Sequence, residues 1–163
     1  MRNIGEQILW LVGLVLLQVV FFNHINLAYV INPFVYIYLV IVFPNNQSHL
    51  ASVIMAFVLG LMVDAFSNTW GIHTIATTVL GYVQTFIYGL IAKPEQLDKS
   101  RPSLAFMNTD FIKYAAVMIV LHHFLLFLIE ASDLSLILWI VAKTIVSSLL
   151  TFLVVYVVEK IRK

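Results

Sequence analysis

The chain has 163 residues, of which 62% are hydrophobic and only 10% are charged; its mean hydropathy is +1.00 and its net charge is +1. Soluble domains carry about 25% charged residues, so this composition predicts an integral membrane protein and leaves no room for a second, soluble domain. The small net charge gives no basis for nucleic-acid binding, and the absence of cysteine excludes disulfides and Cys-ligated metals.

Six apolar segments predict an all-α integral membrane protein with six transmembrane helices in a single domain over residues 1–163. No small-residue cleavage site follows the first segment, which we therefore interpret as a retained helix. In the short second segment, Pro33 predicts a kink or an irregular start, because proline fixes φ and has no backbone donor. A spanning helix needs about 20 apolar residues, and on that basis the helices are expected near residues 4–22, 28–43, 49–66, 71–92, 111–130 and 135–158.

The distribution of basic residues predicts that both termini lie in the cytoplasm. Most Lys and Arg residues fall near the N-terminus, in or beside the connection at 93–110, or in the C-terminal residues 160–163. The connections on the other side of the membrane carry none, which is the positive-inside pattern. Lys143 alone departs from it. The connection at 93–110 is predicted to be a cytoplasmic loop, either a solvated linker or a docking loop.

Asp64 is an acidic residue near the outer end of the third predicted helix. Gly60, Asp64 and Ser67 follow the i, i+4, i+7 spacing and share one helix face. Two interpretations are open. The carboxylate accepts hydrogen bonds from the turn at 67–71, or it forms a buried ion pair or faces a ligand.

Five residues form a candidate intramembrane polar cluster: Asp64, His122, His123, Glu130 and Lys143. Lys143 lies about 12 Å below the outer end of the sixth predicted helix. We expect it to pair with Asp64 or Glu130, with snorkelling to the interface as the alternative. The two histidines are expected to hydrogen-bond neighbouring helices. A proton relay is the alternative, and adjacent histidines point about 100° apart, which makes a poor metal site. No metal or cofactor is predicted.

Small and hydroxyl residues form candidate faces for helix packing or for docking of a partner's helix, because small side chains let helices approach closely. No phosphate-binding loop, dinucleotide fingerprint, serine-hydrolase elbow or zinc-protease motif is found, so the sequence predicts that the chain is not an enzyme. The faces consist of Thr74, Thr78, Gly81 and Thr85 on the fourth predicted helix, and of Thr144, Ser147, Ser148 and Thr151 on the sixth.

With GLMVDAFSNTWGIHTIATTVLGY at 60–82, the chain resembles the MreD family of rod shape-determining proteins, in the form found in Bacteroidetes-type bacteria. Two further stretches, at 23–44 and 121–131, also carry the resemblance. The family motif G-L-x-x-D-x-x-S-x-x-x-G matches Gly60, Leu61, Asp64, Ser67 and Gly71.

The resemblance implies a non-enzymatic scaffold or adaptor of the cell-elongation machinery in the bacterial inner membrane. Such a protein would bind the periplasmic shape protein MreC and act indirectly with MreB and the peptidoglycan synthases. Its fold would be similar to that of the substrate-binding subunits of energy-coupling-factor transporters. Asp64, Ser67 and Gly71 are then interpreted as fixing the turn on the outer face. Gly71 would adopt a conformation that residues with Cβ avoid, or would allow close packing.

The alternative function is that of a membrane transport subunit that binds a small molecule or a lipid. A transporter should have polar side chains that converge on a cavity near the midplane of the membrane. The candidates for such a cavity are Gln18, Gln84, His122, His123 and Lys143.

Overall fold

The computed structural model describes residues 4–24, 32–45, 48–97 and 101–162, and in these ranges it contains helices and no strand. The long helices are α1 (Ile4–Val20), α3 (His49–Ser67), α4 (Ile72–Ile91), α7 (Thr109–Ala131) and α8 (Ile137–Ile161). Between them lie the short helices α2 (Tyr38–Ile41), α5 (Pro94–Leu97) and α6 (Leu104–Met107), and the 3-10 turns η1 (Phe22–His24), η2 (Val35–Ile37) and η3 (Leu134–Leu136).

Four helices in the described part of the chain are long and apolar enough to cross a membrane: α3, α4, α7 and the stretch Leu134–Ile161 that contains α8. Large apolar side chains face outward along them, as at Phe86 and Leu149, which are 68% and 67% exposed. Polar side chains such as Gln84 and His122 are instead completely buried. This inside-out distribution is that of a protein whose solvent is lipid. The chain is therefore an all-helical membrane protein.

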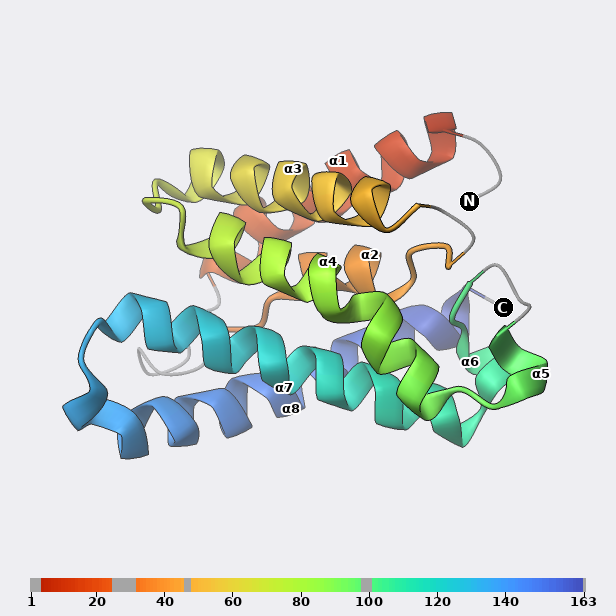
Figure 1. The fold of residues 1–163 in the computed structure, drawn as a ribbon. Coiled ribbons are helices and arrows are strands. Elements are labelled where there is room, and N and C mark those ends of the chain that lie inside the picture. The colour runs from red at the N-terminus through yellow and green to blue at the C-terminus, as the bar shows by residue number, and fades with distance from the viewer. Residues whose placement is uncertain (1–3, 25–31, 46–47, 98–100, 163) are drawn as a thin grey trace.

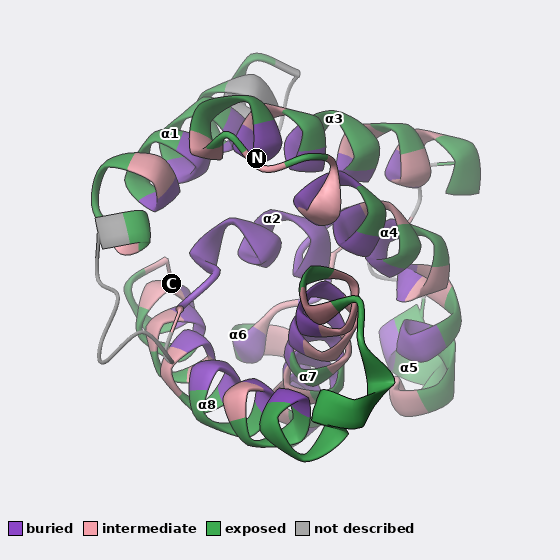
Figure 2. Cartoon of the chain, turned by 90° about the vertical axis from the view of Figure 1, so that its left-hand side faces the viewer, coloured by how far each residue is buried: buried purple, intermediate pink, exposed green. Residues whose placement is uncertain are grey.

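The long helices surround a short central segment. Seen along the bundle, α1, α3, α4, α7 and α8 enclose η2 and α2, whose residues are all buried (Figure 2). The preceding residues 32–34 are not helical, so their backbone groups need partners from side chains. Gln18 accepts a hydrogen bond from the N–H of Val35 and donates to the carbonyl of Pro33. On the other side, Thr151 of α8 accepts from the N–H of Phe34.

The second predicted helix is therefore much shorter than expected. Of the predicted range 28–43, residues 28–31 lie outside the described part and only 35–41 are helical. Seven helical residues extend about 10 Å, too short to cross a bilayer. The irregular start predicted from Pro33 is present at 32–34. The segment remains inside the protein because side chains of α1 and α8 bond its backbone, which the apolar pattern alone did not reveal.

One end of the bundle, which we call the inner end, carries α5, α6, the start of α1 and the end of α8 (Figure 1). The connection at 93–110 is more structured than the predicted linker, because Leu104 and Met107 of α6 are buried. The Glu159 carboxylate accepts hydrogen bonds from the hydroxyl of Tyr38 and the N–H of Leu104, and pairs with Arg162 at 3.2 Å. These contacts join α2, α6 and α8.

The opposite end, called the outer end, consists of the α3–α4 and α7–α8 turns (Figure 1). Two glycines allow α3 and α4 to pack tightly against each other. A Cβ at Gly60 would lie 2.6 Å from Cα of Thr74, and a Cβ at Gly81 would collide with the Cβ of Ala56. Real Cβ atoms do not approach other atoms that closely. Glycine at both positions therefore allows a close approach of α3 and α4 that any other residue would prevent.

Candidate functional site

Asp64 holds the turn at the outer end. Its carboxylate accepts hydrogen bonds from the hydroxyl of Thr69, from the N–H of His73 at 3.1 Å, and from both the N–H and the hydroxyl of Thr74. The two N–H groups belong to the first turn of α4, where helices leave donors without partners. Asp64 is only 5% exposed. Of the two interpretations, bonding to the following turn therefore describes the structure, although the donors include the first residues of α4 as well as the turn.

Gly71 has a φ of +88°, the left-handed region that residues with a Cβ rarely adopt. A Cβ there would meet nothing within 4 Å, so conformation and not close packing explains this glycine. Ser67 accepts a hydrogen bond from Asn23 at 2.7 Å and so connects the turn to the end of α1. Leu61, the remaining motif residue besides Gly60, is 50% exposed and contributes to the outer apolar surface.

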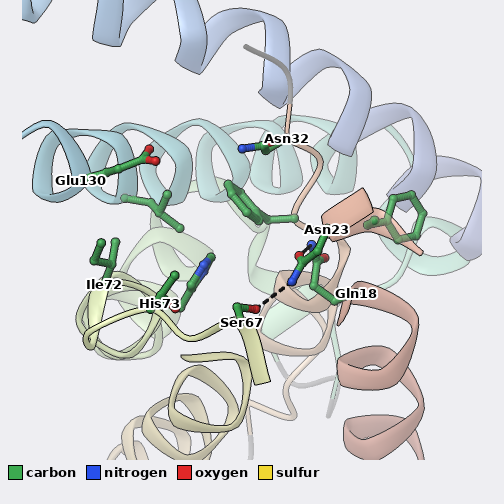
Figure 3. A pocket seen from close by; sticks show the side chains of 11 residues that line it. Gln18, Asn23, Asn32, Ser67, Ile72, His73 and Glu130 are labelled. Atoms are coloured by element: carbon green, nitrogen blue, oxygen red, sulfur yellow. Dashed lines mark hydrogen bonds between the residues drawn. The ribbon is translucent and has the colours of Figure 1, made fainter. Parts of the chain in front are cut away.

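A pocket of about 230 Å³ opens beside this turn, between the end of α1, the start of α4 and the outer half of α7 (Figure 3). Phe22, Phe34, Ile72 and Leu126 supply its apolar wall. No Lys or Arg of the described ranges lines it. Its polar lining consists of Gln18, Asn23, Asn32, Ser67, Thr69, His73 and Glu130.

Beneath the pocket, the hydroxyl of Tyr36 lies 2.9 Å from Nδ1 of His73 and 2.9 Å from Nε2 of His122. Having one proton, the hydroxyl donates to one ring and accepts from the other. Within the described part of the chain, Nδ1 of His122 is buried without a partner. A buried N–H without an acceptor is rarer than an unpaired acceptor. We therefore place the proton of neutral His122 on Nε2, so that Tyr36 donates to His73 and neutral His73 carries its proton on Nε2.

His123 belongs to a separate, complete set of hydrogen bonds. Its Nδ1–H donates to the carbonyl of Ile119 at 2.8 Å, and its Nε2 lies 3.1 Å from the hydroxyl of Thr151. The predicted hydrogen bond to a neighbouring helix is confirmed for His123, which contacts Thr151 of α8, whereas the nearest partner of His122 is Tyr36 of the 3-10 turn η2. Among the described residues, no group of three or more His, Cys, Asp or Glu side chains is placed to hold a metal ion.

Lys143 pairs with Glu130 at 2.8 Å, and its ammonium also lies 4.4 Å from the centre of the Phe127 ring. Pairing with Glu130, one of the two predicted partners, is thus confirmed, and pairing with Asp64 is not found. The predicted polar cluster divides into three: the turn around Asp64, the histidine networks, and the Lys143–Glu130 pair.

The two predicted packing faces are largely internal. Thr74 bonds Asp64, Gly81 contacts α3, and Thr78 donates to the carbonyl of Thr74, while Thr85 is half-buried. On α8, Ser147 and Thr151 accept hydrogen bonds from the N–H groups of Asn32 and Phe34. The hydroxyls of Thr144 and Ser148 are buried without partners in the described part of the chain. Gln84, a candidate for a midplane cavity, donates to Asn45 instead.

Sequence reasoning did not assign roles to Tyr36, His73 or Asn32. Tyr36 lies within the second predicted helix, and His73 follows the family motif without being part of it. A signal was present for His73, because it follows the positive-φ glycine by two residues and so begins α4 beside Asp64. Comparison with protein-family models, with curated proteins and with solved structures gives no match to this chain.

Proposed function

We propose that the chain is a non-enzymatic membrane adaptor of the bacterial cell-elongation machinery. It lies in the inner membrane with both termini in the cytoplasm, and the chain passes through six times. The second pass is the partly helical segment 32–45, which lies inside the bundle. Its outer end binds the periplasmic shape protein MreC and so helps to organise peptidoglycan synthesis, with MreB and the synthases as indirect partners. The proposal rests on the sequence resemblance to MreD and on the construction of the outer end.

The observation that carries the proposal is the rigid, preformed turn at the outer end. Asp64 fixes this turn with four hydrogen bonds, and Trp70 at its tip is 94% exposed. Exposed tryptophans are frequent anchors of protein interfaces. A turn held in one conformation binds a partner without losing further conformational entropy. The motif residues Asp64, Ser67 and Gly71 thus hold the turn that presents Trp70, which is the kind of surface an adaptor requires.

The basic residues support the proposed orientation. Lys93, Lys113, Lys160 and Arg162 lie at or near the inner end, where α8 ends and α5 and α6 are found (Figure 1). Such an accumulation is typical of the cytoplasmic side. The outer end, with the Asp64 turn, would then face the periplasm, where a periplasmic partner is available.

A transport subunit that binds a small molecule or a lipid is the second candidate, and the outer pocket favours it. Binding sites are concave, partly apolar and lined by a few polar groups, which describes this pocket. The two functions differ in what the protein recruits. An adaptor holds other proteins of the cell-elongation machinery, whereas a transport subunit of this kind holds ATPase subunits and a small ligand.

The test is capture of the tagged protein from gently solubilised native membranes, followed by identification of the proteins that remain bound. We expect MreC and the peptidoglycan synthases, and we expect Trp70→Ala to lose them while the protein stays folded. Trp139→Ala is the matched control, because Trp139 is a half-exposed tryptophan on α8 outside the Asp64 turn. Recovery of ATPase subunits or a small ligand in place of MreC would contradict the adaptor function and favour transport.

A further inference from the structure

The outer pocket contains polar groups that the fold itself leaves unused. Glu130 bonds Lys143 through Oε2 alone, so Oε1 has no partner within the described part of the chain. His73 is 6% exposed and lines the pocket, and of its two ring nitrogens only Nδ1 has a hydrogen-bond partner in that same part of the chain. Figure 3 shows both side chains on one side of the pocket, opposite Gln18 and Asn23. The pocket therefore offers a carboxylate acceptor and, at Nε2–H of His73, a donor.

The charges around the pocket favour a positive ligand. Among the described residues, Glu130 is the only formally charged one that lines it, and Thr69 and His73 connect its wall to the carboxylate of Asp64. Two carboxylates thus lie at or just behind the wall. The nearest described basic partner is Lys143, which bonds Glu130 and lines a neighbouring hollow instead of this pocket. This imbalance attracts a cation and repels an anion.

Lys143 shows how this part of the protein already binds an ammonium group. Its Nζ lies between the Glu130 carboxylate and the face of the Phe127 ring, which combines an ion pair with a cation–π contact. The pocket repeats the combination on the other side of Glu130, where the ring of Phe34 forms part of the wall. The volume of about 230 Å³ is many times what a single water needs, so it accommodates the end of a long side chain or a small organic molecule.

We infer that this pocket binds an organic cation, an alkylammonium or guanidinium group that pairs with Glu130, with a neighbouring carbonyl or hydroxyl oxygen that accepts from His73. A free small amine and a Lys or Arg side chain of a partner both carry this chemistry. The inference rests on the proposed function only in placing the pocket on the outer face of the membrane.

The test is calorimetric titration of the purified full chain in lipid nanodiscs with three probes. Nα-acetyl-lysine methylamide carries the cation and carbonyl acceptors, Nα-acetyl-norleucine methylamide is its neutral counterpart, and 5-amino-1-pentanol is a free amine that carries one hydroxyl oxygen. We expect the lysine probe to bind about tenfold or more tightly than the norleucine probe. 5-Amino-1-pentanol binding as tightly as the lysine probe identifies a free amine as the source, and binding of the lysine probe alone identifies a partner side chain.

Variants of the two members of the Glu130–Lys143 ion pair should change the affinity for the lysine probe in opposite directions. Glu130→Gln should weaken the lysine probe about tenfold, whereas Lys143→Met should strengthen it, because Glu130 then loses its competing cation. Asp133→Asn is the matched control, since Asp133 is an outer-end acid that does not line the pocket. The inference would be overturned by any of four results. These are equal affinity for the norleucine and lysine probes, no loss of lysine-probe affinity in Glu130→Gln, a loss of that affinity in Lys143→Met, or no saturable binding.

Capture experiments on the same variants separate this inference from the proposed function. If the wild-type chain recovers MreC but does not bind the lysine probe, the adaptor function stands and the cation site fails. If binding of the probe depends on Glu130 but no cell-elongation protein is recovered, the cation site stands and the adaptor function fails.

Discussion

At the inner end of the bundle, the buried acids lie beside basic side chains, whereas at the outer end Asp64 is surrounded by neutral donors. Glu159 pairs with Arg162, and Asp110 lies 3.4 Å from Lys113 and 3.7 Å from Lys93. Asp64 instead accepts from two hydroxyls and two backbone N–H groups. The inner end is thus compensated in charge, and the outer end keeps a negative charge that no described basic residue neutralises.

This difference separates two uses of a buried carboxylate. At the inner end, basic side chains neutralise the buried carboxylates and leave little charge to attract a ligand. At the outer end, the two carboxylate oxygens of Asp64 fix a turn by accepting from neutral donors. The negative charge of Asp64 therefore still acts on the open pocket beside it. The outer end therefore combines structural rigidity with an electrostatic preference, and the inner end supplies rigidity alone.

The largest expected effect comes from neutralising the acid at each end. Asp64→Asn keeps one acceptor oxygen but turns an amide toward groups that are all donors. We expect it to lower the free energy of unfolding by about 3 kcal/mol. Glu159→Gln leaves Arg162 bonded to the hydroxyl of Tyr38, so its cost should be about 1–2 kcal/mol. Reversible unfolding in mixed micelles measures both.

A larger loss for Glu159→Gln than for Asp64→Asn would break the comparison, because it would show that the ion pairs carry more stability than the turn. An Asp64→Asn variant as stable as the wild type would show that the shape of the turn does not depend on the charge of Asp64.

Because α3 and α4 pack closely at the outer end, Gly60→Ala should have the next largest effect on stability. A Cβ at Gly60 would lie 2.6 Å from Cα of Thr74 and 2.8 Å from the carbonyl oxygen of His73, and backbone atoms there have little freedom to move. Gly60→Ala should therefore destabilise by about 1–3 kcal/mol, and should also weaken ligand binding in the pocket because α4 begins at its wall. Gly89 near the inner end of α4 is the control, since its Cβ would meet nothing within 4 Å.

Gly89→Ala should be neutral or gain about 0.5–1 kcal/mol, because alanine is the better helix former. If both alanine variants had the same unfolding free energy in mixed micelles, the close approach of α3 and α4 at Gly60 would not be a tight contact.

The turns before α4 and α7 allow a further comparison. Gly71 precedes α4 at φ +88°, and Asn108 precedes α7 at φ 51°. Gly71→Ala should cost about 1 kcal/mol, because alanine is strained in this region. Asn108→Gly should gain up to about 1 kcal/mol by relieving the same strain at the inner end. Thermal unfolding of the two variants tests this, and opposite signs are required.

Much of the fold could be predicted from the sequence because its main signals are local. Long apolar segments indicated α3, α4, α7 and α8, and the Gly60 motif indicated the tight turn after α3. The pairing of Lys143 with Glu130 followed from the tilt of helical side chains toward the helix N-terminus. Each of these depends on spacing within one element or between neighbours in the chain.

The interior of the bundle could not be predicted in the same way, because its contacts join distant parts of the chain. Residues 35–41 are apolar enough to resemble part of a spanning helix, yet Gln18 and Thr151 bond the backbone around them from α1 and α8. His73 and His122 meet only because Tyr36 lies between them. The pocket likewise combines residues of α1, α4 and α7, which no local pattern brings together.

The smallest predicted effect is a pH dependence at the α7–α8 turn of the outer end. The backbone N–H of Ser135 donates to Asp133, which lowers the pKa of that exposed carboxyl below its ordinary value of 3.8. Because the folded pKa lies below the unfolded one, the ionised group stabilises the protein above the unfolded pKa. That contribution is lost as the pH falls through the folded pKa, below about pH 4. Wild type should therefore melt slightly above Asp133→Asn at pH 7, and the two melting temperatures should converge in acid. Unlike Asp64, Asp133 is an outer-end acid that water already solvates. Suppose that Asp133→Asn lowered the melting temperature at pH 7 as much as Asp64→Asn does. Neither burial nor the arrangement of donors would then distinguish the two acids.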